Sequence, residues 1–431
     1  MPRGVCCVRW FVSRRVQDAL GCTPPSLVRI ILNPHDAVHG SPSARVRRVL
    51  AIAVLAALLT AFRFAAPAWA GTDSRAQQLG LNSGADIYRG ACAACHGPDG
   101  QGTPQVTAGF TKPDTFPHFD KCEETTPEFT EDYTAVIRDG GPARGFSPIM
   151  PSFSGVLSAA EINKVVRYLR SLCKEPGWPL GELNVPRALV TEKAFPESET
   201  VFTTTANVKG PATVMNEVGY ERILGKRDQL EVAVPFGWAH QAGAGLGAGL
   251  GDITIGDKHV LFSRLHSSPD EPLYASTGSI FSVQAEVTLP TGSVSKGLGA
   301  GETVFGVFGA YDLLLPSQTF LQLQAGADFP LHVHETSRSV YLHTAFGKTF
   351  SAELGRQWSP TLEVLGDRDL GPGSVTDWDL LPEFQVTLNR RQHVRAAVGY
   401  RLPINDTAGR PKQVVAYFLW DWFDGGLLEG W

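Results

Sequence analysis

The stretch Ala91-Cys92-Ala93-Ala94-Cys95-His96-Gly97 decides the fold of the first half of the chain. It contains a C-x-x-C-H motif. On a helical turn the two cysteines and the histidine stand at positions i, i+3 and i+4, so all three side chains project from one face. This spacing is the attachment signature of c-type haem, in which the thiols form thioethers and the histidine binds iron. We therefore expect haem c on Cys92 and Cys95, with His96 as an iron ligand.

The same residues could instead form a redox-active cysteine pair or half of a zinc site. A structural zinc site needs four ligands, commonly two such pairs, and a redox pair usually accompanies a βαβ pattern. The sequence contains no second C-x-x-C, and strands do not alternate with helices around this one. Haem attachment therefore explains the motif better than either alternative.

Helical periodicity lies on both sides of the motif. Apolar residues recur at helical spacing from Ser83 to Cys95, and the sequence 97–100, Gly-Pro-Asp-Gly, ends that pattern. A second helix is predicted from Leu157 to Cys173, where Ser158 and Glu161 have the spacing of a capping box before an apolar stripe. These patterns predict a small all-α domain.

Met150 is the main candidate for a second axial ligand. Only three methionines occur in the chain, and the other two lie outside this region. Pro148 and Pro151 flank Met150 and would stiffen a loop that crosses the second haem face. His118 is a rival ligand, and a methionine that only fills the core is the structural alternative.

A helix with C-x-x-C-H, a loop with Met-Pro-x-Phe and a closing helix with Tyr-Leu-Arg resemble a class I monohaem cytochrome c over about residues 80–175. The resemblance implies His96 as the proximal ligand and Met150 as the distal ligand. Ligation by histidine and methionine fills both axial sites, and this arrangement suits outer-sphere electron transfer better than substrate binding. The resemblance therefore favours a non-enzymatic electron carrier, and an enzyme is the alternative.

The amino terminus predicts export. Residues 44–70 combine Arg45, Arg47 and Arg48 with an apolar run and Ala-Trp-Ala before Gly71, as in a signal peptide, and residues 1–43 read as untranslated or disordered. A membrane anchor is the alternative, but the apolar run is shorter than the ~20 residues that a spanning helix needs. Without residues 1–70 the net charge is about −12, which argues against a nucleic-acid partner. In an oxidising compartment, Cys122 and Cys173 are predicted to form a disulfide, with two buried thiols as the alternative.

Residues 176–200 hold four prolines and read as a connector between residues 71–175 and 201–431. From residue 201 onward, apolar and polar residues alternate with period two in about twelve segments of roughly 9–12 residues, which is typical of membrane-spanning barrel strands. A soluble β-domain would show the same alternation. Export, abundant glycine and an aromatic carboxyl terminus favour an antiparallel β-barrel in the outer membrane.

The stretch Gly249 to Lys258 resembles bacterial outer-membrane proteins of the MetA-pathway phenol-degradation transporter type. This resemblance covers about residues 210–431 and implies a porin-like channel. The glycines at 243–251 do not indicate a nucleotide loop, because neither Gly-Lys-Ser/Thr nor a helix follows. His332 and His334 could bind a metal, but two polar residues facing the lumen are the simpler interpretation.

These observations predict a multidomain protein in which a small cytochrome c domain precedes a barrel of about twelve strands. The leading hypothesis is electron transfer by a haem domain in the periplasm, exchanging electrons with a redox partner protein and anchored to the outer membrane. The second is a transporter of a small organic solute, with the haem domain as plug, sensor or docking module. A third is an oxidoreductase whose haem accepts electrons from chemistry elsewhere.

Overall fold

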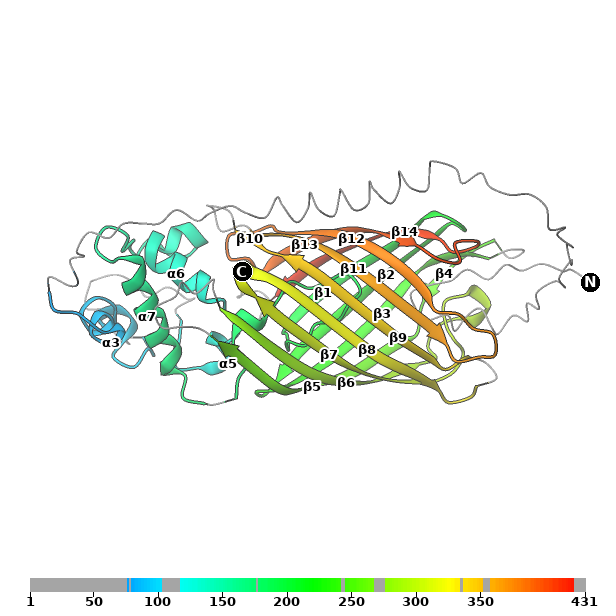
Figure 1. Cartoon of the computed structure of the whole chain (residues 1–431), viewed down its shortest axis with the longest axis horizontal. Helices are drawn as coiled ribbons and strands as arrows, with labels where there is room; N and C mark the ends of the chain where they lie inside the picture. The colour runs from blue at the N-terminus through cyan, green and yellow to red at the C-terminus, as the bar shows by residue number, and fades with distance from the viewer. Residues whose placement is uncertain are drawn as a thin grey trace, which may run out of the picture. The chain divides into compact units, whose positions relative to one another are not determined.

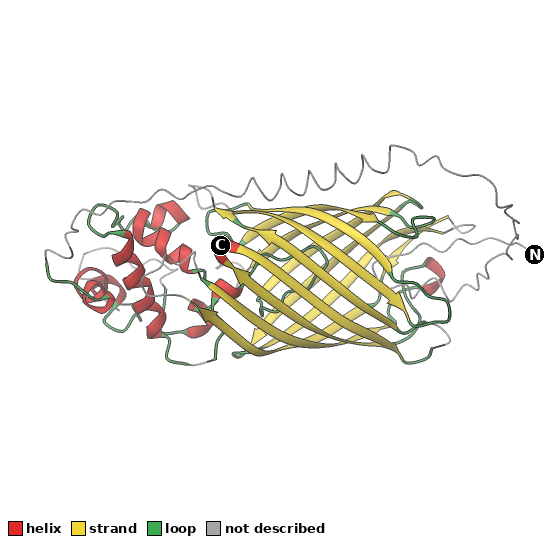
Figure 2. Cartoon of the chain, in the orientation of Figure 1, coloured by secondary structure: helices red, strands yellow, loops and turns green. Residues whose placement is uncertain are grey.

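The computed structural model describes Ala76 and residues 79–102, 117–175, 177–241, 245–266, 276–333, 336–351 and 357–421. The predicted signal peptide, residues 44–70, and the stretch 1–43 lie outside these ranges. Within the described ranges, no helix is both long and apolar enough to cross a membrane. The α-helices precede β1, and antiparallel strands follow, with two short 3₁₀ turns among them, η7 (Val294–Lys296) and η8 (Pro316–Gln318) (Figures 1 and 2). This order confirms the predicted fold class.

The C-x-x-C-H motif lies on three consecutive helical segments, α3 (Gly84–Ile87), the π-helical turn η3 (Tyr88–Cys92) and α4 (Ala93–His96). The Asp86 amide N–H donates to the Ser83 hydroxyl oxygen at 3.1 Å, which caps the first turn. A helix therefore forms where the periodicity predicts one. The π-helical turn inside it is a local widening that a 3.6-residue pattern does not indicate.

The other helices of this region are α5 (Cys122–Thr125), α6 (Thr130–Asp139), η4 (Gly141–Arg144) and α7 (Ala159–Leu172). The predicted capping box is present at the start of α7, where the Ser158 and Glu161 side chains bond to each other's backbone N–H. Helix α3 crosses α7 closely, because a Cβ added at Gly84 would lie 2.0 Å from the Lys164 carbonyl oxygen. Any residue larger than glycine would push these two helices apart.

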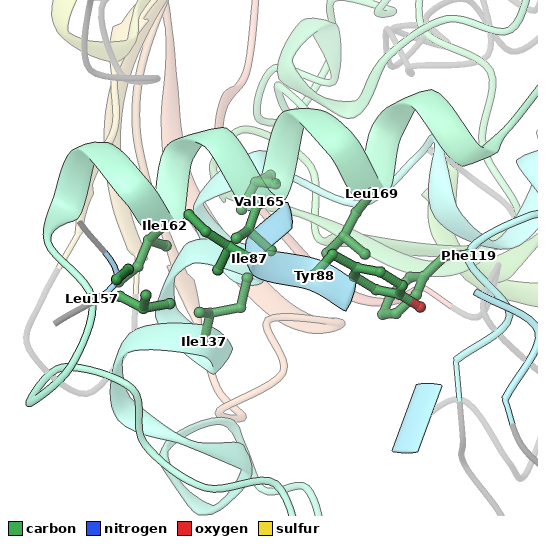
Figure 3. Close-up of a cluster of buried hydrophobic side chains, with 10 residues drawn as sticks. Ile87, Tyr88, Phe119, Ile137, Leu157, Ile162, Val165 and Leu169 are labelled. Carbon is green, nitrogen blue, oxygen red and sulfur yellow. The ribbon is translucent and has the colours of Figure 1, made fainter. Parts of the chain in front are cut away.

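The core of the helical region lies between these helices (Figure 3). Ile87 and Tyr88 are fully buried, and so are the valines of the apolar stripe of α7. The Tyr88 hydroxyl donates to the Gly97 carbonyl oxygen at 2.7 Å, so its one polar atom is satisfied. Partly buried side chains around this core include those of Cys92 and Met150. The segment with the haem motif and the loop with Met150 therefore pack on the same core.

The strands follow a short 3₁₀ helix, η5 (Gly181–Leu183). Two of the strands are short, β4 (Gly245–Leu250) and β10 (Phe350–Ser351). The long strands are β1 (Glu199–Lys209), β2 (Thr213–Leu224), β3 (Asp228–Gln241), β5 (Ile253–His266), β6 (Thr277–Leu289), β7 (Val304–Leu315), β8 (Thr319–Pro330), β9 (Ser339–Lys348), β11 (Gln357–Asp369), β12 (Asp377–Thr387), β13 (Val394–Pro403) and β14 (Lys412–Asp421).

The twelve long strands form a closed antiparallel barrel. Consecutive strands pair, β9 pairs with β11, and β1 pairs with β14 from Glu199 opposite Asp421. In Figure 1 the strands run side by side and are tilted, as barrel closure requires. The strand number agrees with the sequence prediction of about twelve.

The barrel is polar inside and apolar outside. On β8, the side chains of Gln322 and Gln324 are buried, whereas Phe329 of the opposite face is 45% exposed. The same inversion recurs around the ring, because Glu363 on β11 is fully buried while Phe346 on β9 is 51% exposed. A soluble barrel would bury the phenylalanines and expose the polar residues.

Residues 181–198, here called the lumen segment, lie inside the barrel. Their backbone N–H groups donate to inward-facing side chains on several strands: Leu189 to Glu383 on β12 at 2.9 Å, Thr191 to Glu363 on β11 at 2.7 Å, and Ala194 to Asp312 on β7 at 2.7 Å. Most of the segment is buried. The stretch that the sequence indicates as a connector therefore also fills the lumen.

Candidate haem site

The structure brings Cys92, Cys95 and His96 together at the end of one helix. Cys92 ends η3, and Cys95 and His96 lie in α4, so their helical spacing is as the motif predicts. The chain then turns sharply at Gly97, which has φ +77° and whose added Cβ would lie 2.6 Å from the Gly102 carbonyl oxygen. Only glycine fits this turn. The three side chains therefore share the helix end, and the backbone turns away directly after the histidine.

His96 lies in an apolar environment. Its ring centroid is 5.1 Å from that of Phe119. Burial lowers the pKa of His96 to about 4, so the imidazole is neutral at physiological pH. A neutral imidazole nitrogen is the form that binds iron, and the site keeps the histidine in that form without a proton to displace.

The two cysteines are half-buried. Neither is in a disulfide. Burial, followed by the neighbouring Cys95, raises the pKa of the Cys92 thiol to about 11. Redox-active C-x-x-C motifs work in the opposite direction, because they depress the pKa of the attacking thiol. The electrostatics therefore favour a haem attachment site over a dithiol redox site.

Met150 lies in a tight loop that we call the methionine loop, residues 140–150. The Gly141 N–H donates to the Met150 carbonyl oxygen at 3.0 Å, and the Phe146 N–H donates to the Gly141 carbonyl oxygen at 2.9 Å. Gly140 and Gly145 have φ values of +85° and +76°, which favour glycine. The two prolines predicted to stiffen this region thus act alongside glycines and backbone hydrogen bonds that the sequence does not show directly.

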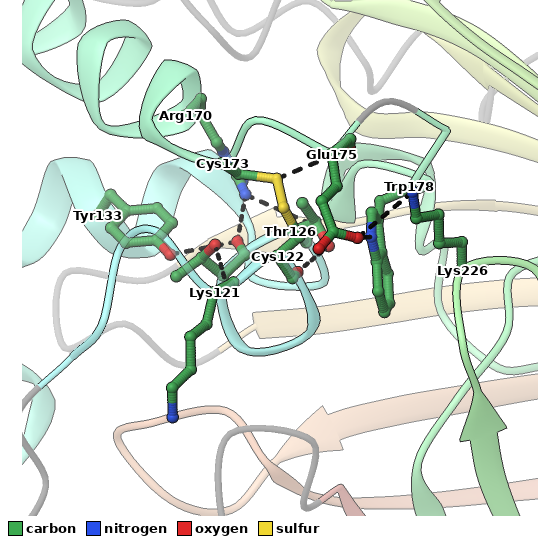
Figure 4. Close-up of a disulfide and its surroundings, with 10 residues drawn as sticks. Lys121, Cys122, Thr126, Tyr133, Arg170, Cys173, Glu175, Trp178 and Lys226 are labelled. Carbon is green, nitrogen blue, oxygen red and sulfur yellow. Dashed lines mark hydrogen bonds and ion pairs between the residues drawn. A yellow bond between two sulfur atoms is a disulfide. The ribbon is translucent and has the colours of Figure 1, made fainter. Parts of the chain in front are cut away.

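Cys122 and Cys173 are joined by a disulfide in the structure, with a Cα–Cα distance of 5.1 Å (Figure 4). The bond ties α5 to the end of α7. Arg170 of α7 strengthens the same junction, because its guanidinium lies 5.0 Å from the centroid of the Tyr133 ring and donates to the carbonyl oxygens of Thr125 and Glu128. Residues 122–173 are thereby closed into one loop.

The structure gives less support to the other predicted metal ligands. His118 is half-buried next to Phe119. His332 has an exposed side chain, its backbone N–H donates to Glu302 at 2.7 Å, and His334 lies outside the described residues. The structure thus leaves the metal interpretation of the two histidines without a described ligand cluster.

The sequence patterns do not indicate a cluster of three carboxylates that the structure contains. The carboxyl oxygens of Glu197, Glu199 and Asp421 lie within 4.8 Å of one another, all buried. Each also pairs with a cation: Glu197 with Lys193, Glu199 with Arg187 at 2.8 Å, and Asp421 with Arg395 at 3.5 Å. This group is therefore an ion-pair network between the lumen segment and the ends of β1 and β14. Arg395 and Asp421 are far from its other members in sequence, so no local pattern indicates the complete network.

Comparison with protein families found one match within the helical region. Residues 80–169 match the family model described as cytochrome c oxidase, cbb3-type, subunit III, and this match supports a cytochrome c domain with a haem cofactor in this part of the chain. The comparison with curated proteins found no match.

Several solved structures match about half of this chain. The COG4313 outer membrane channel from Pseudomonas putida F1 is 13% identical, with 53% of this chain and 97% of that chain covered and a TM-score of 0.34. The KdgM porin is 9% identical, with 52% and 99% covered and a TM-score of 0.31. The beta domain of the Bordetella autotransporter BrkA is 12% identical, with 52% and 98% covered and a TM-score of 0.31.

Proposed function

We propose that this protein transfers single electrons through a covalently attached haem c, with the cytochrome c domain in the periplasm and the barrel as its anchor in the outer membrane. Cys92 and Cys95 hold the haem, and His96 and Met150 are its axial ligands. The haem supplies reversible one-electron chemistry at iron. The observation that carries the proposal is the C-x-x-C-H motif on a helix end, with a neutral, half-buried histidine.

The packing supports Met150 as the distal ligand. Its side chain and that of Cys92 lie against one core. The rival His118 directly precedes Phe119, whose ring is 5.1 Å from the His96 ring, so it adjoins the proximal ligand. A second axial ligand has to approach from the opposite haem face. This geometry favours the methionine loop over His118.

The outer surface of the barrel supports a membrane location. Large apolar side chains point outward along most strands, among them Trp238, Phe305 and Phe384, each more than two-fifths exposed. In water this surface would be costly, because contiguous apolar patches of this kind drive association. Lipid removes the cost, while backbone polar groups are paired within the closed ring.

Strand connections support the orientation. The barrel has an even number of strands, so β1 begins and β14 ends at the same rim, where Glu199 lies opposite Asp421. At that rim the connections 225–227 and 316–318 are short and 267–276 is longer, whereas at the other rim 210–212 is short and 290–303 is long. Long connections are typical of the extracellular side, so the longest connection, 290–303, favours a periplasmic location for the opposite rim, at which β1 begins.

Transport of a small organic solute is the second candidate. The resemblance of Gly249–Lys258 to phenol-degradation transporters favours it. A cavity of about 150 Å³ supports it too, with lining that includes Val190 of the lumen segment, Tyr341 and His343. The hydrogen bonds that fix the lumen segment argue against a permanently open pore, so we favour the anchor.

The test uses the full-length chain expressed in a Gram-negative host that attaches haem c. After fractionation, we expect covalent haem in the outer membrane and weak far-red absorption of the oxidised protein, which reports sulfur bound to iron. Met150→Ala should abolish that absorption. Met215→Ala, which removes a buried methionine of β2, should retain it.

Each half of the proposal can fail separately. Haem recovered only in a soluble fraction would exclude the membrane anchor. Far-red absorption that persists in Met150→Ala would exclude methionine ligation. Ion conductance of the unaltered protein that depends on a small aromatic solute would favour the transporter.

A further inference from the structure

The connection between β12 and β13, residues 388–393, is a structured turn that contacts the methionine loop. The described residues from Ala76 to Asp421 fall in one compact unit. The Leu388 N–H donates to the Val394 carbonyl oxygen at 2.7 Å, and the Val394 N–H donates to the Asn389 side chain at 3.1 Å. Gln392 has φ +67°. These bonds fix the direction in which the turn presents its two arginines.

Arg391 contacts the methionine loop at Phe146 and Gly145. Its guanidinium carbon lies 4.5 Å from the centroid of the Phe146 ring, and its Nη2 donates to the Gly145 carbonyl oxygen at 3.3 Å. A guanidinium over an aromatic face is attracted by the ring quadrupole, and its planar shape adds stacking that an ammonium lacks. The neighbouring Arg390 donates to the Pro142 carbonyl oxygen at 3.2 Å.

The contact is reciprocal. Arg144 of the methionine loop is buried, pairs with Asp132 at 2.7 Å and donates to the Arg390 carbonyl oxygen at 3.3 Å. Gln392 of the turn donates to the same Asp132 carboxylate at 3.2 Å. Side chains from both segments therefore lock the turn and the loop together.

Hydrogen bonds within the methionine loop connect Phe146 to the proposed ligand, Met150. The Phe146 N–H donates a hydrogen bond to the Gly141 carbonyl oxygen at 2.9 Å, and the Gly141 N–H donates one to the Met150 carbonyl oxygen at 3.0 Å. The loop is too tight to absorb a shift, because a Cβ added at Gly141 would lie 2.3 Å from the Ser147 carbonyl oxygen. We therefore expect a displacement of Phe146 to displace Met150 as well.

We propose that Arg391 is a positioning residue for the haem: by stacking on Phe146 it holds the methionine loop, and through it the distal ligand Met150, from the barrel. This inference rests on the proposed function, because it assumes that Met150 binds iron. It makes the barrel part of what sets the reduction potential, since a firmly held thioether stabilises the reduced iron.

The test compares variants of the full-length protein in detergent. Arg391→Ala should weaken the far-red absorption of the oxidised haem and lower the reduction potential. Phe146→Leu should do the same from the other side of the contact, and Arg391→Lys should restore only part of the loss because it keeps the charge without the planar stack. The matched control is Arg264→Ala, which removes an arginine 5.7 Å from the Phe262 ring on β5 and should change neither property.

The outcomes separate the two levels of inference. If Met150→Ala loses the far-red absorption but Arg391→Ala and Phe146→Leu keep it together with the original potential, the positioning role is wrong and methionine ligation stands. If the unaltered protein lacks the absorption, the ligation is wrong and the positioning role falls with it. Haem content and far-UV circular dichroism of each variant show that a loss is not caused by unfolding.

Discussion

The N–H of Gly141 donates to the carbonyl oxygen of Met150 at 3.0 Å, across nine positions of the chain, and thereby closes the methionine loop at its base. The close approach is possible because residue 141 has no side chain. This single contact links the helical core, the loop and the proposed iron ligand, and it can be tested directly.

Gly141→Ala should open the loop. The new methyl group would lie 2.3 Å from the Ser147 carbonyl oxygen, so the backbone has to move. We expect a destabilisation of about 1–3 kcal/mol, as for other overpacked sites, and weaker far-red absorption. Gly155→Ala is the control, because nothing lies within 4 Å of its added Cβ. Equal spectra and equal denaturation midpoints for the two variants would contradict the expectation.

Removing the Cys122–Cys173 disulfide should loosen the helical region without affecting haem attachment. The bond closes a loop over a sequence separation of 51 residues. Cys122→Ser with Cys173→Ser should therefore cost about 2–4 kcal/mol of unfolding free energy. The measurement is thermal unfolding of the protein, followed by the haem absorption. Alkylation of the unaltered protein before and after reduction shows whether the bond is present at all, and two freely alkylated thiols would refute it.

Loss of the carboxylates that hold the lumen segment should raise the ion conductance of the barrel. Glu363→Ala and Glu383→Ala leave buried N–H groups of the segment without an acceptor, at a cost of about 1–3 kcal/mol each. Single-channel recording in planar bilayers is the measurement. Leu342→Ala, on the outer face, serves as the control. Conductance that is already high in the unaltered protein, or unchanged in the double variant, would show that the segment does not obstruct ion flow.

A charge on the outer face of the barrel should hinder membrane assembly. Leu342 is 45% exposed near the middle of β9, and Leu342→Arg would place a guanidinium in lipid at a cost of about 2–4 kcal/mol. Leu331→Arg is matched to it, because Leu331 is 60% exposed just beyond β8. We expect Leu342→Arg to fold into lipid vesicles in lower yield than Leu331→Arg. The folding yield is measured by the gel mobility of unheated samples. Similar folding yields would contradict a membrane-embedded face.

Local patterns predicted much of this molecule because their causes are local. The capping box at Ser158, the C-x-x-C-H helix and the period-two alternation each depend on residues within one turn or one strand. Alternation also predicted which residues share a face. It could not say which face is inside, because Gln322 inward with Phe329 outward gives the same pattern as the reverse. That choice depends on the solvent around the barrel.

The features that escaped prediction depend on partners far apart in sequence. Leu189 and Glu383 are 194 positions apart, and Arg391 and Gly145 are 246 positions apart. Proline content suggested a connector for residues 176–200 but carries no information about the carboxylates that would receive its N–H groups. The π-helical turn at Tyr88–Cys92 was missed for another reason, since its periodicity differs too little from that of an α-helix over five residues.

The pairing of β1 with β14 has a consequence for biogenesis. The first and last strands of the ring meet along a seam that starts at Glu199 opposite Asp421, so the ring cannot shut until the final strand has emerged. The lumen segment directly precedes β1 and is hydrogen-bonded to β7, β11 and β12. It can therefore be enclosed while the ring is still an open sheet, and threading through a finished pore is unnecessary. The order of synthesis and the order of assembly are thus compatible.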